Sequence, residues 1–127
     1  MRVWLYARLS NDDDQEMNSL LNQQEICQAF AEQHGYIIVG QSFDDNVSGM
    51  KFNRRGLDEL MAAVDADKID AVIVKDLSRL GRHRTQTALF IDYLREHQVR
   101  VISATEGVDT FRDEDDLIIG VRGLMND

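Results

Sequence analysis

Residues 71–82 read Ala71-Val72-Ile73-Val74-Lys75-Asp76-Leu77-Ser78-Arg79-Leu80-Gly81-Arg82, an apolar run that passes directly into a basic loop. A short run of apolar, mostly β-branched residues predicts a strand that is buried on both faces. The loop after it is rich in bases and contains Asp76 as its acid. In α/β proteins with parallel strands, ligands bind beyond the carboxyl ends of the strands, so this loop is a candidate binding edge.

Further strand-like and helix-like segments alternate on both sides of this stretch. The alternation predicts a single three-layer α/β domain with a mostly parallel sheet of four or five strands flanked by helices. Residues 44–55 lack an apolar period and are expected to form a loop. The other strands are predicted at Val3 to Ala7, Tyr36 to Val39 and Val99 to Ile102, and the helices at Ser19 to Gly35, at Leu57 to Val64 and around Leu89 to Leu94.

Composition indicates one globular domain. The chain has 127 residues, of which 43% are hydrophobic and 29% are charged, which argues against disordered and fibrous proteins. No apolar run is long enough for a membrane span and no secretory signal is visible, so a cytoplasmic location is expected. Cys27 is the sole cysteine, which excludes an intrachain disulfide and a cysteine-based zinc site.

The charge is unevenly distributed. The formal net charge is −9, with 23 acidic and 14 basic residues, which argues against binding nucleic acid through bulk electrostatics. Acidic residues are concentrated at 12–16 and at 109–116, whereas the segment from Lys75 to Arg84 is locally basic. A basic loop in an acidic protein indicates a specific anion site rather than a general affinity for polyanions.

Serine and arginine side chains are predicted to meet at the carboxyl edge of the sheet. The first strand leads to Arg8 and Ser10, and Arg54 follows the second. Guanidinium groups match the oxygens of a phosphodiester. Taken singly, a serine after a strand is more often a turn residue, and a surface arginine is more often an ion-pair partner. Gln23 faces inward on its helix, and its spacing alone favours an ordinary hydrogen bond from helix to loop.

Several blocks in order resemble the catalytic domain of the serine recombinases, the resolvase and invertase group, and are most similar to the large serine recombinases and transposases. Together the blocks extend over most of residues 3–103. They are Tyr6-Ala7-Arg8-Leu9-Ser10, Ser19-Leu20-Leu21-Asn22-Gln23, Asp44-Asp45-Asn46-Val47-Ser48-Gly49, Arg54-Arg55-Gly56-Leu57 and Val72 to Arg82.

The resemblance implies DNA strand exchange by transesterification. Ser10 would attack a DNA phosphodiester, forming a 5′-phosphoserine link and releasing a 3′-hydroxyl. The catalytic residues implied beside it are Arg8, Arg54, Arg79, Arg82 and Gln23, and the implied substrate contacts are Asp45, Ser48, Lys75 and Ser78. The small members of the family often carry Asp at the position of Ser78. In an extended segment Asp76 would point to the other side, so it is not expected to replace that acid.

The resemblance also implies a layout and partners. The sheet would follow a flavodoxin-like order with an extra edge strand near residues 107–111. Residues 1–127 would be the N-terminal catalytic domain, with about 115–127 starting a truncated oligomerisation helix and with DNA-binding domains beyond Asp127. DNA and further copies of the chain, as homodimer and tetramer, are then the expected partners. No metal and no other cofactor is expected, and the fragment is expected to be inactive alone.

Two other function classes stay open on the residues alone. A receiver-like signalling domain would use Asp12, Asp13 and Asp76 with Mg²⁺ and Lys75, although the neighbouring arginines would compete with the cation. A non-catalytic module of the same fold would use the arginines to hold a phosphate or a partner carboxylate. A saturable Mg²⁺ effect on Trp4 fluorescence would favour the receiver, and a denaturant-stable DNA adduct would favour the recombinase.

Overall fold

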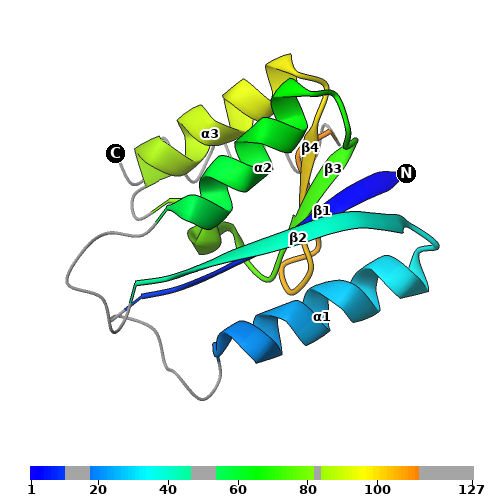
Figure 1. Ribbon diagram of the computed structural model, residues 1–127, viewed down its shortest axis with the longest axis vertical. Coiled ribbons are helices and arrows are strands. Elements are labelled where there is room, and N and C mark those ends of the chain that lie inside the picture. The colour runs from blue at the N-terminus through cyan, green and yellow to red at the C-terminus, as the bar shows by residue number, and fades with distance from the viewer. Residues whose placement is uncertain (11–17, 47–53, 82–83, 112–127) are drawn as a thin grey trace.

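The computed structural model describes residues 1–10, 18–46, 54–81 and 84–111. The sheet has five strands in the order β2-β1-β3-β4-β5, parallel except for β5, which confirms the expected α/β class and the extra edge strand (Figure 1). The expected helix near 115–127 lies outside the described residues. The elements are β1 (Arg2–Leu9), α1 (Leu20–Gln33), β2 (Ile37–Asp45), α2 (Arg55–Asp65), β3 (Ala71–Val74), the 3₁₀ helix η1 (Leu77–Arg79), α3 (Arg84–Glu96), β4 (Arg100–Ser103) and β5 (Val108–Asp109).

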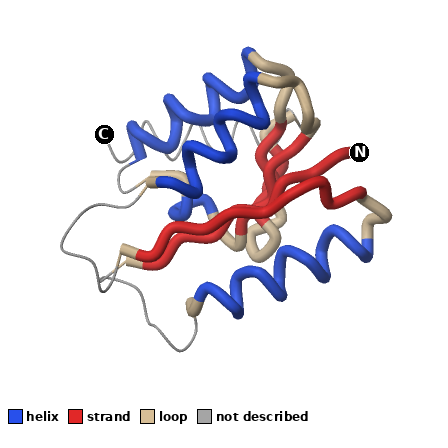
Figure 2. Tube along the Cα trace, viewed as in Figure 1, coloured by secondary structure: helices blue, strands red, loops and turns tan. Residues whose placement is uncertain are grey.

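Helices cover both faces of the sheet. Figure 2 shows α1 below the strands and α2 with α3 above them. Alternate residues of β3 serve the two sides: Val72 and Val74 pack toward α2 and α3, and Ala71 and Ile73 pack toward α1. Such two-sided burial explains why this strand is an unbroken apolar run. In the described part of the chain, no helix has the length and apolar character needed to cross a membrane.

The boundaries of α1 follow local chemistry. The Ser19 side chain accepts a hydrogen bond from the backbone N–H of Asn22 at 3.1 Å, so it caps the helix as predicted. After Gln33 the chain turns at Gly35, whose φ of +69° is accessible to glycine at low cost. The helix therefore begins and ends where the sequence indicated.

The second strand is longer than predicted. We expected it to end at Val39 and residues 44–55 to form a loop, but β2 continues through Asp45, pairing residue by residue with β1 up to Leu9. Its second half is polar on the buried side, with Ser42 and Asp44 facing inward, whereas Phe43 is half exposed. Because polar residues face inward and an apolar residue faces outward, apolar periodicity does not reveal this half of the strand.

The buried Asp44 carboxylate joins β1, β2 and α2. Asp44 is 1% exposed and accepts hydrogen bonds from the Tyr6 hydroxyl at 2.7 Å and from the backbone N–H groups of Gly56 at 2.7 Å and Leu57 at 3.0 Å. The two N–H groups belong to the first turn of α2, where a negative charge is favoured. A Cβ on Gly56 would lie 2.4 Å from the carbonyl oxygen of Phe43, so only glycine permits this approach. Asp44 therefore fixes the start of α2 against the sheet.

Replacing Tyr6 by Phe tests this junction. Removing a hydrogen bond to a buried carboxylate is expected to lower the free energy of unfolding by about 1.5–3 kcal/mol at neutral pH. Burial, and then the Asp44 hydrogen bond, raise the pKa of Tyr6 above its ordinary value. Above pH about 10 the Tyr6 phenol ionises in the unfolded state but stays protonated in the folded state, which lowers the free energy of unfolding of the wild type. Tyr6→Phe has no such phenol, so the difference in free energy of unfolding between the two proteins is expected to narrow as the pH rises. Urea unfolding of both proteins, from neutral pH to above pH about 10, measures this difference. A difference that widens as the pH rises would contradict the role given to the Tyr6 hydroxyl.

Candidate functional site

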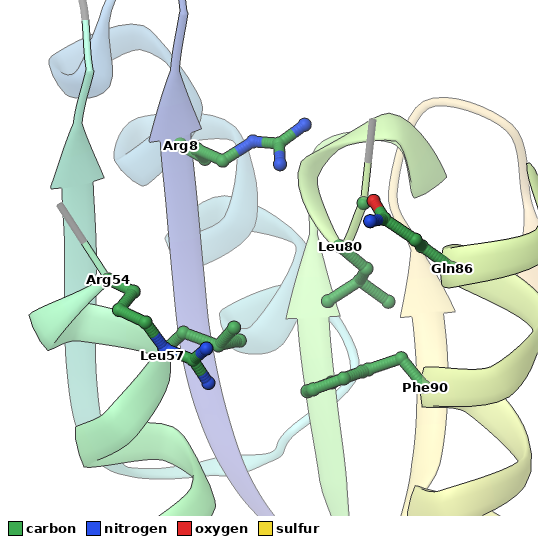
Figure 3. Close-up of a pocket in the computed structure, with 7 residues that line it drawn as sticks. Arg8, Arg54, Leu57, Leu80, Gln86 and Phe90 are labelled. Atoms are coloured by element: carbon green, nitrogen blue, oxygen red, sulfur yellow. The ribbon is translucent and has the colours of Figure 1, made fainter. Parts of the chain in front are cut away.

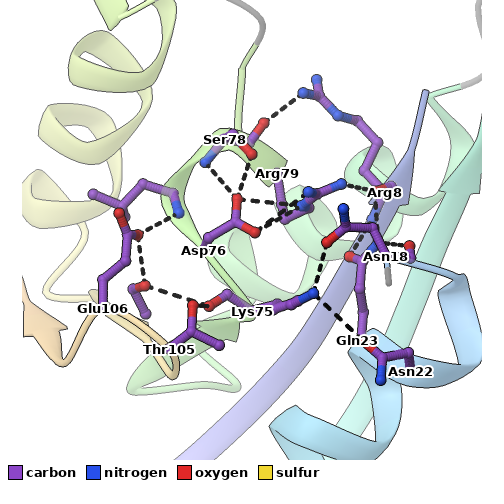
Figure 4. A network of polar contacts seen from close by, with 12 residues as sticks. Arg8, Asn18, Asn22, Gln23, Lys75, Asp76, Ser78, Arg79, Thr105 and Glu106 are labelled. Atoms are coloured by element: carbon purple, nitrogen blue, oxygen red, sulfur yellow. Dashed lines mark hydrogen bonds and ion pairs between the residues drawn. The ribbon is translucent and has the colours of Figure 1, made fainter. Parts of the chain in front are cut away.

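The carboxyl end of β1 extends beyond its pairing with β3, which is limited to Val3–Leu5. The peptide groups of Arg8 are bound by the side chain of Gln23 from α1. The Gln23 amide oxygen accepts from the Arg8 N–H at 3.1 Å, and the Gln23 amide nitrogen donates to the Arg8 carbonyl at 2.9 Å (Figure 4). Gln23 is fully buried, and its amide also donates to the Asn18 carbonyl at 2.7 Å. The inward amide noted in the sequence thus acts in place of a neighbouring strand.

Arg79, from η1, binds the same Arg8 carbonyl. Its guanidinium donates to the Arg8 carbonyl at 2.6 Å and pairs with Asp76 at 3.3 Å. Arg79 is 4% exposed, so most of its donors are committed to protein groups. The structure brings Arg79, Gln23 and Arg8 together, with Arg79 acting on the backbone that precedes Ser10.

Asp76 does not point away from the site, as an extended segment would require. The chain turns into η1 immediately after it, and the Asp76 carboxylate accepts from the Ser78 N–H at 3.1 Å, from the Ser78 hydroxyl and from Arg79. The assumption of an extended segment from Asp76 to Ser78 was wrong, because the chain turns into η1 there. Because the Asp76 carboxylate is engaged in these bonds, its assignment as the phospho-acceptor of a receiver-like domain is weakened.

Lys75 connects the end of β3 to the start of α1. Its ammonium group donates to the side-chain oxygens of Asn18 at 2.6 Å and Asn22 at 3.4 Å. Both asparagines belong to the segment that carries Gln23. Lys75 therefore connects the end of β3 to the start of α1. The sequence predicted Lys75 as a substrate contact but did not predict this connection.

Arg8 and Arg54 line one pocket of about 380 Å³. Figure 3 shows the two guanidinium groups entering it from β1 and from the start of α2, with Leu80, Gln86 and Phe90 on the other side. Leu57 and Gly81 complete its lining. Two permanent positive charges above an apolar floor can bind a phosphodiester while excluding part of its water.

The two pocket arginines are held differently. The Arg8 guanidinium donates to the backbone carbonyl of Ser78. Arg54 is exposed and pairs with Asp58 at 3.2 Å across one turn of α2, a type of surface pair that contributes little to stability. Arg54 is therefore held in place chiefly by the anchored start of α2.

The remaining predicted site residues are distributed around this edge. Ser10 follows the last residue of β1 and is half buried, Asp45 ends β2, and Ser78 is exposed in η1. Arg82 and Ser48 lie outside the described residues. All the predicted residues that are described come from the loops and element ends at or near the carboxyl edge of the sheet, as expected for this fold.

Sequence reasoning missed Asp44 as an anchor and gave no function to Gln86, Phe90 or Glu106. Phe90 was assigned only to the apolar stripe of its helix. A signal for Asp44 existed in the alternation Ser42, Phe43, Asp44, which places polar residues on the face that packs against α2. Glu106 lies far in sequence from the loop after β3, and no local pattern predicted its contact with Leu77 in that loop.

Cys27 is buried and is not suited to act as a nucleophile. Burial raises the pKa of the Cys27 thiol to about 12, so it stays protonated and weakly nucleophilic at neutral pH. Within residues 1–10, 18–46, 54–81 and 84–111, no group of three His, Cys, Asp or Glu side chains is arranged to hold a metal ion. Ser10 follows the pocket residue Arg8 by two positions.

Comparison with known proteins identifies the family. The sequence model described as "Resolvase, N terminal domain" matches residues 3–127. A resolvase family site-specific recombinase from Streptococcus pneumoniae superimposes with a TM-score of 0.82 at 28% identity, covering 98% of this chain and 85% of that one.

Two further structures share the fold. The N-terminal catalytic domain of TP901-1 integrase has a TM-score of 0.82 at 24% identity, covering 99% of this chain and 94% of that one. The C-terminal catalytic domain of ISC1926 TnpA, an IS607-like serine recombinase, has a TM-score of 0.68 at 20% identity, with both chains fully covered. The family match over nearly the whole sequence and the resolvase-family structure at 28% identity favour the recombinase over the receiver-like and non-catalytic alternatives. The chain belongs to the resolvase family and is the catalytic domain of a site-specific recombinase.

Proposed function

We propose that this domain cuts and rejoins DNA through the Ser10 hydroxyl. Ser10 stands two residues after Arg8, whose peptide is bound by Gln23 and Arg79 and whose side chain enters the same pocket as Arg54. This convergence of guanidinium groups beside the end of β1 is the observation that carries the proposal. The proposal requires that a scissile phosphate held by the pocket arginines reach the Ser10 hydroxyl, which follows a backbone bound by Gln23 and Arg79.

The reaction exchanges one phosphodiester for another. The Ser10 oxygen forms a bond to phosphorus, the bond from phosphorus to the 3′ oxygen breaks, and the 3′ oxygen gains a proton while the serine proton is lost. The product is a 5′-phosphoserine and a free 3′-hydroxyl. In the reverse step a 3′-hydroxyl attacks that phosphoserine and releases the serine. Because the covalent link conserves the phosphodiester free energy, resealing requires no nucleotide cofactor.

The arginines supply the electrostatic part of catalysis. A serine hydroxyl is a weak nucleophile at neutral pH and needs activation. Guanidinium groups at the pocket favour the alkoxide and stabilise the pentacoordinate phosphorane, which carries more negative charge than the bound diester. Arg8 and Arg54 face the pocket, and we assign the same role to Arg82. Asp45, Ser48, Lys75 and Ser78 are proposed to contact or position the DNA around the scissile phosphate.

Stable DNA binding needs more than this domain. The net charge of −9 opposes general binding to DNA, since affinity depends strongly on phosphate neutralisation. We propose that DNA-binding domains follow residue 127, that residues 115–127 start an oligomerisation helix, and that the active form is a homodimer that assembles into a tetramer. The full-length recombinase would act on DNA in the cytoplasm, and residues 1–127 alone would be inactive.

Covalent trapping tests the nucleophile. The full-length protein is incubated with a supercoiled plasmid library that carries randomised inserts, and DNA that stays attached in denaturant is recovered and sequenced. Wild type is expected to form the adduct, with the nucleotide mapped to Ser10 by mass spectrometry after nuclease digestion. Ser10→Ala is expected to bind the recovered duplex and form no adduct. Tyr93→Phe, which removes a hydroxyl bound to Asp65 on the surface, is the control and should behave as wild type.

An adduct with Ser10→Ala, or a nucleotide on another residue of the wild type, would overturn the assignment of Ser10.

Arg54 and Arg55, which are neighbours in the sequence, can distinguish an effect of the pocket on the cleavage rate from an effect of net charge. Arg54 lines the pocket and Arg55 does not, although both are exposed. Arg54→Ala is expected to slow adduct formation on saturating duplex by about 10²–10³-fold, the usual cost of one donor that stabilises a transition state. Arg55→Ala removes the same charge from the next residue and is expected to change that rate little. Equal slowing by both variants would show that net charge, and not placement in the pocket, determines the rate.

Gln23 tests the support of the β1 end. Gln23→Glu keeps an acceptor for the Arg8 N–H but loses the donor to the carbonyls of Arg8 and Asn18. Losing these two hydrogen bonds is expected to cost about 1–3 kcal/mol in the free energy of unfolding. Denaturant unfolding of the domain measures the loss. A variant as stable as wild type would contradict the role given to this amide.

A further inference from the structure

The turn between β4 and β5 is bonded to the end of β3. The Thr105 backbone N–H and hydroxyl both donate to the Lys75 carbonyl, at 3.0 and 2.7 Å, and the Ala104 N–H donates to the Val74 carbonyl at 2.9 Å. These bonds fix the backbone from which the catalytic loop departs. Figure 4 shows Thr105 and Glu106 on the side of the network opposite to Arg8.

Glu106 extends this contact to η1 itself. One oxygen of its carboxylate accepts from the backbone N–H of Leu77 at 2.9 Å and from the Ser103 hydroxyl at 2.7 Å. Leu77 is the first residue of η1, and N–H groups at the start of a helix have no acceptor within it. Ser103 is fully buried in β4, so its hydroxyl orients the carboxylate toward the turn.

The other N–H groups of η1 are bound from within the loop. The Ser78 N–H donates to the Asp76 carboxylate, the Arg79 N–H to the Asp76 carbonyl at 3.2 Å, and the Leu80 N–H to the Leu77 carbonyl at 3.1 Å. Glu106 thus supplies an acceptor for the first N–H from a different part of the fold. It ties a short turn, with little stability of its own, to the sheet.

The position of η1 determines two contacts to β1, the strand that precedes Ser10. The Arg79 guanidinium donates to the Arg8 carbonyl at 2.6 Å, and the Ser78 carbonyl accepts from the Arg8 guanidinium. A shift of η1 would move both contacts, one on the backbone and one on the side chain of Arg8. Glu106 stands at the far end of this chain of hydrogen bonds.

We propose that Glu106 is a positioning residue for strand cleavage, acting through η1 on Arg8 and Arg79 without touching DNA. The inference rests on the proposed function of Ser10. Small misplacements of groups around a reacting centre reduce the rate of chemistry more than they reduce binding. Removing Glu106 is therefore expected to lower the single-turnover rate of cleavage and to leave the affinity for DNA unchanged.

The test compares three variants of the full-length protein on the duplex recovered by covalent trapping. Glu106→Ala is expected to slow single-turnover adduct formation by about 10–100-fold, with the Kd for the duplex unchanged. Glu106→Gln keeps a carbonyl oxygen for Leu77 and Ser103, so it is expected to restore most of the rate. Glu59→Ala removes an exposed glutamate of α2 and is expected to match wild type.

A second readout is independent of activity. Amide hydrogen exchange by NMR on residues 1–127 is expected to quicken at Leu77 and its η1 neighbours in Glu106→Ala, but not in Glu59→Ala. Adduct formation by Glu106→Ala at the wild-type rate, a Gln variant as slow as the Ala variant, or unchanged exchange at Leu77 would each overturn the proposal. If wild type forms no adduct, the assignment of Ser10 fails, and the exchange measurement still decides whether Glu106 holds the turn.

Discussion

The site depends on one constraint, which is that the peptide of Arg8 must be hydrogen-bonded where β3 no longer pairs with β1. A buried peptide group without partners costs free energy comparable to a lost hydrogen bond. Gln23 binds both its N–H and its carbonyl, and Arg79 binds the carbonyl again. The end of β1 is thereby held in extended form up to the residue before Ser10. The hydroxyl is presented from a fixed backbone and not from a free loop.

The same constraint divides the arginines into two roles. The sequence presents them as equivalent phosphate ligands, but Arg79 is buried and paired with Asp76, whereas Arg8 and Arg54 line the pocket. A buried guanidinium is costly unless its charge is balanced and its donors are bound. Asp76 and the Arg8 carbonyl meet that requirement. Arg79 thus stabilises the backbone beside the pocket, whereas Arg8 and Arg54 are the arginines proposed to contact the substrate.

The parts of the fold that sequence predicted are those with a local signal. The apolar run at 71–74, the Ser19 cap and the stop at Gly35 all depend on neighbours in the chain, and each was placed correctly. The polar half of β2 was missed because its inward residues are Ser42 and Asp44, which are satisfied by Trp4, Tyr6 and the backbone of α2. Their partners lie far away in sequence, where no periodicity reports them.

The same distinction applies to the site. The positions of Ser10, Arg8 and Gln23 at one edge could be predicted, since they follow from strand order and helix face. The turn at Asp76 could not, because a 3₁₀ helix of three residues leaves almost no trace in composition. The contact of Glu106 with Leu77 depends on the packing of β4 beside β3, which only the assembled sheet creates.

The spacing of the two pocket arginines follows from backbone contacts. Arg8 is paired in register with Asp44 across β1 and β2, and Asp44 in turn binds two N–H groups in the first turn of α2, the helix that begins directly after Arg54. Two guanidinium groups repel one another, so a bond between them could not set their separation. A rigid path through strand register, a buried carboxylate and a helix start does so instead. The two guanidinium groups are therefore positioned by the folded backbone, and in the proposed reaction this is the form of preorganisation that stabilises a charged transition state.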